Sequence, residues 1–236
     1  MQNQDEIIYF NYFFRFDHSE EQFSITLNLN DLRIINVDNT NKPKWTRLEY
    51  KKCSNCKLKE NEHPYCPVAL NFSDIIPSFR NYVSYDRVYV RVETADRNYE
   101  KDTTVQQGLS SLLGIIMVTS GCPTMQILRP MVRFHLPFAT IEETIFRSAS
   151  SYLLAQYFRL KNGEKPDWNM ENLLKGYEEI QLVNVGITNR LRNISKMDAN
   201  TNAVIVLDVF AKEMPYSIFE GLKNLQYLYE DFLNKR

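Results

Sequence analysis

The sequence predicts an α+β fold, in which an N-terminal antiparallel sheet packs against a C-terminal helical bundle. Apolar residues alternate with polar ones in several runs before residue 102, which is typical of half-buried strands. After residue 103 they recur every three or four residues, which is typical of helices. Between two of the strand-like runs, residues 53–66 hold three of the four cysteines and one of the three histidines. This segment predicts a zinc-binding loop inserted between strands.

The first two strands form a predicted hairpin. In the run 8–16, alternate aromatic and aliphatic residues share one face, and in 22–29 the alternation of apolar and polar residues is cleaner. A polar turn at 17–21 separates these runs, and a later run around Val88, Val90 and Val92 repeats the pattern. Period-two alternation gives a sheet with one exposed and one covered face, so we expect helices to supply the cover.

Residues typical of helix ends divide the second part of the chain into several predicted helices. Gly121 suits the position just past the end of a helix around 109–116, and Pro123 suits the start of the next. Thr140 and Glu143 form the pattern of a capping box for a long helix, which we expect to end near Gly163.

Two further helices are predicted from apolar residues spaced three or four apart, and we call each such row of residues a seam. The first seam contains one polar residue, Asn184. The apolar positions are Leu173, Tyr177, Ile180, Ile187 and Leu191 in the first seam, then Ile218, Leu222, Leu225, Tyr229 and Phe232 in the second. Such spacing is typical of helices that pack on one another. Asn184 either fixes the register of its seam or lies at the seam's margin. We expect one domain over residues 1–236, with 1–102 mainly strands and 103–236 mainly helices.

Composition narrows the class of protein. The chain has 236 residues, 44% of them hydrophobic, and a net charge of -1, which gives no general attraction for nucleic acid. The first residues lack the positive charge of a signal peptide, and the longest apolar runs are too short to cross a membrane. We therefore expect a soluble cytoplasmic protein, in which clustered cysteines indicate metal or redox chemistry before disulfides.

The predicted metal ligands are Cys53, Cys56, His63 and Cys66. Structural zinc takes four thiolate or imidazole ligands, and a pair of cysteines two residues apart turns both sulfurs toward one ion. Because all four positions would be filled by side chains, the site would be structural rather than catalytic. Cys122 is an alternative to His63 as the fourth ligand. Two other interpretations are ordinary small residues in a turn and a redox pair of Cys53 and Cys56.

A second segment offers weaker catalytic candidates. If Pro123 is the first helical residue, Cys122 is the cap, and the positive helix end would lower the pKa of its thiol. His135 would act as its base, and Arg129 and Arg133 would hold an anionic substrate. The simpler interpretation is that Cys122 and His135 are packing residues. A third hypothesis is a redox switch that joins Cys122 to a cysteine of the 53–66 loop.

The sequence resembles a family of uncharacterised bacterial proteins classed as a domain of unknown function. The residues that carry this resemblance are 45–48, the Cys53 and Cys56 pair, 63–69, 120–123, 129–140 and 166–168. The resemblance implies a bacterial source and a stand-alone domain, and it implies no activity or substrate.

We therefore expect a zinc-stabilised binding or regulatory domain without catalysis, and the enzyme with Cys122 and His135 is the alternative. The partner would be another protein or a small anionic ligand. The C-terminal helix is able to pair with a second copy of the chain, which would give a homo-oligomer.

Overall fold

The computed structural model of the chain describes residues 7–35 and 42–233. The first residues, on whose charge the expectation of no export signal depends, lie outside these ranges. The strands are β1 (Ile7–Arg15), β2 (Glu20–Asn28), β3 (Ile34–Ile35), β4 (Arg87–Glu93) and β5 (Asn98–Thr104). The α-helices are α1 (Pro67–Phe72), α2 (Val105–Thr119), α3 (Ile141–Lys161), α4 (Glu171–Leu191), α5 (Ala199–Asn224) and α6 (Glu230–Leu233). The 3-10 helices are η1 (Lys44–Thr46), η2 (Ile76–Phe79), η3 (Pro123–Val132) and η4 (Gln226–Tyr229).

The predicted sheet is confirmed. The described strands form one antiparallel sheet in the order β3-β2-β1-β4-β5. Alternate residues of β1 and β4 are buried, among them Tyr12, Phe14, Val90 and Val92, all at 0% exposure. This one-sided burial follows from the pleat, which sends successive side chains to opposite faces.

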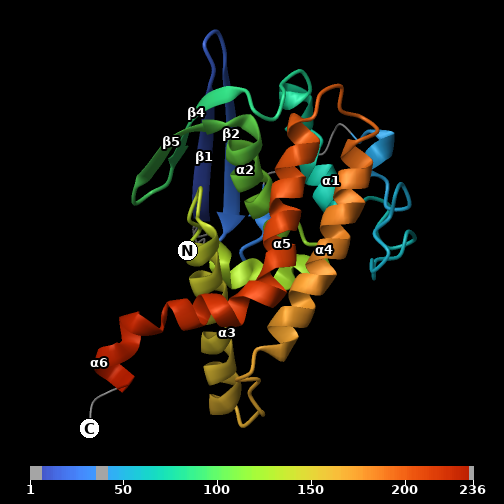
Figure 1. Cartoon of the computed structure of the whole chain (residues 1–236). Helices are drawn as coiled ribbons and strands as arrows, with labels where there is room; N and C mark the ends of the chain where they lie inside the picture. Colours follow the sequence, from blue (N-terminus) through green and yellow to red (C-terminus); the bar gives the residue numbers. More distant parts are fainter. Residues whose placement is uncertain (1–6, 36–41, 234–236) are drawn as a thin grey trace, which may run out of the picture.

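Helix α2 covers the apolar face of the sheet. A Cβ added to Gly108 would lie 2.7 Å from Cγ2 of Val90 and 3.1 Å from Cε1 of Phe14, so the helix backbone lies directly on the strands. Helix α5 contacts α2 from the other side, and α4 contacts α5. Figure 1 shows this succession of sheet, α2, α5 and α4 across the molecule. The predicted α+β arrangement is therefore observed, with α2 at its centre.

The predicted helix boundaries agree with the structure at three places. Gly121 has a φ of +94° just past α2, a conformation that favours glycine. Pro123 opens η3. The hydroxyl of Thr140 accepts from the N–H of Glu143 at 3.2 Å, and the Glu143 carboxylate accepts from the N–H of Thr140 at 2.7 Å. The capping box therefore fixes the start of α3.

The last predicted seam is wrong beyond Leu225. Helix α5 ends at Asn224 and is followed by η4 and α6, where Tyr229 is 43% and Phe232 77% exposed. The reason is the position of the chain end, because α5 runs out past the other helices and carries α6 away from the sheet (Figure 1). Correct helical spacing therefore did not produce burial at these two positions.

The segment with three cysteines joins β3 to β4, as expected, and lies along α4 at the edge away from the sheet (Figure 1). It is held together by a bridge between Arg47 and Tyr65 and by the N–H of Cys66, which donates to the carbonyl of Thr46 at 2.8 Å. Within the described ranges, no single helix has the length and apolarity to cross a membrane; α2 and η3 reach them only as a pair bent by 115°.

Candidate functional site

Cys53 lies in tight contact with α4. Its Sγ is 3.9 Å from the carbonyl oxygen of Val183, and the N–H of Cys56 donates to the carbonyl of Cys53 at 3.1 Å to close the turn. A Cβ added to Gly186 would overlap Sγ of Cys53 and would lie 3.1 Å from its Cβ and 3.2 Å from its Cα. The absence of a side chain at Gly186 is therefore what lets this turn approach the helix.

Cys66 and Cys122 occupy the same local position in two different helices. Each is an N-cap followed by proline, Cys66 for α1 and Cys122 for η3. The backbone N–H groups of the second and third helical residues lower the pKa of each thiol, although neither sulfur makes a cap hydrogen bond of ordinary length. Each of these two sulfurs therefore lies at the start of a helix.

The four cysteines come together in the fold. Burial, followed by the neighbouring thiolates, raises the pKa of Cys53 to about 12, and each of the six pairs among Cys53, Cys56, Cys66 and Cys122 interacts electrostatically. All four are free thiols. No group of three or more cysteine, histidine, aspartate or glutamate side chains in the described ranges is arranged to hold a metal ion as it stands. The thiols are therefore neighbours without forming a closed tetrahedron.

Arg190 is the charged neighbour of this thiol cluster. It is only 1% exposed, and its charge lowers the pKa values of Cys53 and Cys66. The guanidinium makes no ion pair with a carboxylate of the described residues, and its Nε has no hydrogen-bond partner. It donates instead to three main-chain carbonyls of the cysteine-bearing segment: Trp45 at 2.7 Å, Arg47 at 2.7 Å and Leu48 at 2.8 Å.

His63 lies apart from the thiols in the contacts that the structure records. It is exposed, and its main-chain N–H donates to the carbonyl of Lys59 at 2.8 Å. Of the two sequence-predicted fourth ligands, Cys122 is the one that the fold brings to Cys53, Cys56 and Cys66. The sequence signal that could have favoured it is the Cys-Pro pair that Cys66-Pro67 and Cys122-Pro123 share.

Cys122 and His135, the proposed catalytic pair, make no recorded contact with each other among the described residues. Burial raises the pKa of Cys122 to about 11, which opposes formation of a thiolate. Nε2 of His135 instead shares a 2.8 Å hydrogen bond with the hydroxyl of Tyr12, and its ring packs edge-on against Phe10. Burial, with a smaller effect of the Arg147 charge, lowers the pKa of His135 to about 3. The imidazole is therefore neutral near pH 7.

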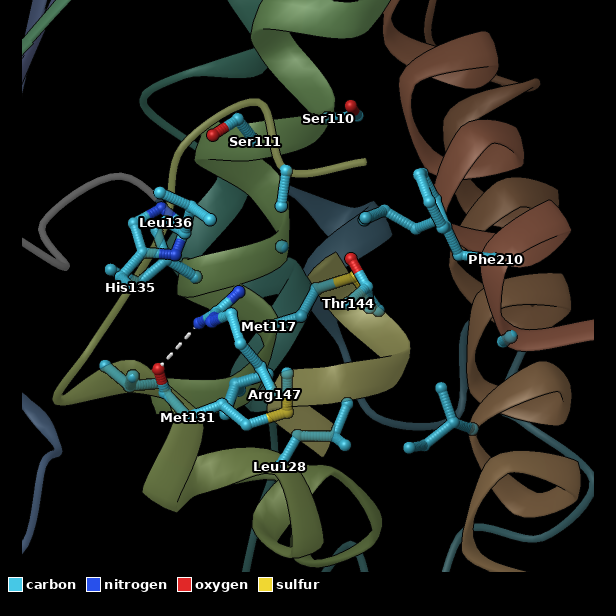
Figure 2. A pocket seen from close by; sticks show the side chains of 18 of the residues that line it. Ser110, Ser111, Met117, Leu128, Met131, His135, Leu136, Thr144, Arg147 and Phe210 are labelled. Atoms are coloured by element: carbon cyan, nitrogen blue, oxygen red, sulfur yellow. Dashed lines mark hydrogen bonds between the residues drawn. The ribbon is translucent and has the colours of Figure 1, made fainter. Parts of the chain in front are cut away.

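A cavity of about 200 Å³ lies among α2, η3, α3, α4 and α5. Its wall is mainly apolar, with four methionines: Met117, Met125, Met131 and Met214. Figure 2 shows Arg147 and His135 on one side of this space and Phe210 of α5 on the other. The space is thus lined by the helical half of the chain and contains a basic group.

Arg147 is the charged group of the cavity wall, and Arg129 and Arg133 do not line it. Nη2 of Arg147 donates to the carbonyls of Met131 at 3.0 Å and Phe134 at 2.9 Å. Arg133 is exposed, with its guanidinium 5.7 Å from the ring centre of Phe134. Nε and Nη2 of Arg129 are buried without a hydrogen-bond partner among the described residues. That Arg129 and Arg133 hold an anion stays a prediction, and Arg147 is a further basic residue that the sequence did not single out.

Asn184 is a polar residue of the wall with an unpaired donor. It is 1% exposed, and its Nδ2 has no hydrogen-bond partner among the described residues. An unpaired buried donor costs about 1–3 kcal/mol. The sequence marked this residue as the polar member of an apolar seam, and the structure places it at the cavity.

Comparison with curated proteins finds no match, and comparison with solved structures finds none either. The family that the sequence resembles is confirmed by its model. That model, described as a domain of unknown function (DUF6901), matches residues 8–230, and the chain therefore belongs to this family.

Proposed function

We propose that the protein is a zinc-stabilised binding domain, in which Cys53, Cys56, Cys66 and Cys122 hold one structural zinc ion. The observation that carries the proposal is the convergence of these four thiols from the 53–66 segment and from Cys122, at the start of η3. Four thiolates are a common ligand set for structural zinc, and they leave no coordination position for a reacting water. Zinc binding would require all four sulfurs to lie about 2.3 Å from the ion.

The surroundings of the thiols support a negatively charged centre. Zinc with four thiolates carries about two net negative charges by formal counting. A buried guanidinium without an anionic partner is costly, and Arg190 is such a group. The metal centre would supply its counter-charge. The N–H groups at the starts of α1 and η3 would add further donors to the sulfurs of Cys66 and Cys122.

The ion would cross-link parts of the chain that are distant in sequence. Cys53 and Cys56 lie in the segment along α4, Cys66 begins α1, and Cys122 joins α2 to η3. One ion bound to all four would fix these segments against the helices that line the cavity. In this proposal the cavity binds a small anionic ligand, and the metal ion stabilises the fold around the cavity. Thiolate ligands also favour a reducing compartment such as the cytoplasm.

The test compares the metal content of three proteins. Purified wild-type protein and the variant His63→Gln should each contain about one zinc per chain by elemental analysis. Cys122→Ser should bind zinc at least about tenfold more weakly in a chelator competition. Cobalt in place of zinc should give the intense visible absorption of tetrahedral thiolate coordination in wild type.

Two results would overturn the ligand assignment. Metal-free protein whose four thiols are all readily alkylated would exclude a zinc centre. If His63→Gln loses the metal while Cys122→Ser keeps it, the fourth ligand is the imidazole.

A redox switch is the second candidate, because Cys122 neighbours the loop cysteines. Two of these thiols would lose two protons and two electrons to an oxidant such as hydrogen peroxide and form a disulfide. Peptide mapping of peroxide-treated protein without reductant would detect a bond between Cys122 and the 53–66 segment. If zinc-loaded protein forms no such bond, the metal centre alone remains.

A further inference from the structure

We propose that the cavity binds a small carboxylic acid with an apolar body, whose carboxylate pairs with Arg147 and whose far end offers a second oxygen to Asn184. This inference deepens the proposed binding function by naming the class of ligand, and it does not depend on which metal the thiols hold.

The size of the cavity sets the size of the ligand. A dry engineered cavity of roughly 150 Å³ accepts benzene. The cavity here is about 200 Å³, so a ring with a short substituent, or a branched chain of about ten heavy atoms, fits inside it. Methionine-rich walls adapt to irregular apolar shapes. An apolar body is therefore the natural content of the space.

Arg147 supplies the charge for the carboxylate. Its two bonds to the carbonyls of Met131 and Phe134 engage Nη2 and orient the plane of the guanidinium. No carboxylate of the described residues makes an ion pair with it. The nearby Glu143 carboxylate, whose charge raises the pKa of Arg147, accepts a hydrogen bond from the N–H of Thr140. An oriented guanidinium with nitrogens to spare matches the planar geometry of a carboxylate.

Asn184 defines the far end of the ligand. Tyr177, which lies close enough to raise the pKa of Arg147, lines the cavity seven residues before Asn184 on α4. Seven residues of helix span about 10 Å. Arg147 is partly exposed and Asn184 is buried, so the carboxylate would enter last and the far end first. A carbonyl or hydroxyl oxygen there would satisfy the unpaired Nδ2 of Asn184.

The probe for the test is 4-acetylbenzoate, which has a carboxylate, a ring and a distal carbonyl. Its neutral analogue 4-acetylbenzamide has nearly the same shape. Calorimetric titration of wild-type protein should show binding of the acid about 10- to 100-fold tighter than binding of the amide, as expected for a charge-assisted pair. Benzoate, which lacks the distal carbonyl, should bind several-fold more weakly than 4-acetylbenzoate.

Variants separate the contributions. Arg147→Met should remove the preference for the acid, whereas Arg133→Met, outside the cavity, should keep it. Because Arg147 also holds two carbonyls, a second variant keeps this group and fills the space: Ala211→Leu on the wall should abolish binding of both probes. Asn184→Leu should reduce the advantage of 4-acetylbenzoate over benzoate.

The proposal is overturned if folded wild-type protein binds neither probe, if acid and amide bind equally, or if Arg147→Met keeps the preference for the acid. Zinc content is measured on the same samples. Zinc-loaded protein that does not bind 4-acetylbenzoate contradicts this inference alone. Zinc-free protein that binds 4-acetylbenzoate contradicts the metal proposal alone.

Discussion

Replacing Gly186 with alanine tests the contact between the cysteine-bearing segment and α4. The new Cβ would lie 3.1 Å from Cβ and 3.2 Å from Cα of Cys53, where carbon atoms prefer about 3.5–4.0 Å. Rotation of the cysteine side chain moves Sγ but does not remove the approach to Cα. The segment must therefore withdraw from the helix by about half an ångström.

Two opposing terms set the size of the effect. Overpacking of this kind costs about 1–3 kcal/mol, and alanine in place of glycine inside a helix returns about 1 kcal/mol. We expect a net loss of about 1 kcal/mol in the free energy of unfolding, or about 2–4 °C in Tm. Zinc affinity should fall more steeply, by about 10- to 100-fold, because ligand distances tolerate only about 0.2 Å of error.

The assay is urea unfolding with zinc and with a chelator, together with zinc competition. Gly114→Ala is the matched control, because its new Cβ would meet only the flexible end of Leu207, 3.3 Å away. This control should be as stable as wild type or slightly more stable. Equal unfolding free energies and equal zinc affinities for the two alanine variants would refute the argument.

Three further predictions concern stability. Thr140→Ala should lower the unfolding free energy by about 1 kcal/mol by removing the capping box, and Thr140→Ser should restore it; equal melting temperatures for all three proteins would contradict this. Because the pKa of His135 is about 3 when folded and 6.5 ordinarily, its neutral form contributes stability above pH 6.5 that is lost as the pH falls toward 3. Urea unfolding between pH 7 and 4 should therefore be less pH-dependent in His135→Gln, and an unchanged slope would disprove the buried neutral ring. Arg190→Met should cost about 3 kcal/mol or more, since three carbonyls lose their donor, and Arg190→Lys should recover only part of this loss in the same assay.

Local signals in the sequence were sufficient for β1, β2 and β4 and for the helix boundaries at Gly121, Pro123 and Thr140, but β3 and β5 were not predicted. The alternation around Val90 and the capping box at Thr140 depend on neighbours within one element, and both appear in the structure. The failure beyond Leu225 has the opposite origin, because burial there depends on a partner surface that the sequence does not display. That the whole chain is one domain stays a prediction.

The candidate sites were only partly visible for the same reason. Cys53, Cys56 and Cys66 are close in sequence, and their grouping was predicted. Arg190 was not predicted, since only the three-dimensional fold brings it to a segment more than 140 residues earlier. Asn184 was noticed as a polar residue in an apolar seam, but the cavity beside it results from the packing of five helical elements.

The long reach of Arg190 has a consequence for biosynthesis. Its bond to the carbonyl of Trp45 spans 145 positions of the chain, so the segment that bears three cysteines emerges from the ribosome well before α4 exists to receive it. Until translation passes that helix, these thiols remain open to solvent and to oxidants. In the proposed zinc protein, metal loading would therefore follow synthesis of most of the polypeptide, and a nascent chain stalled before α4 would be the form most exposed to oxidative damage.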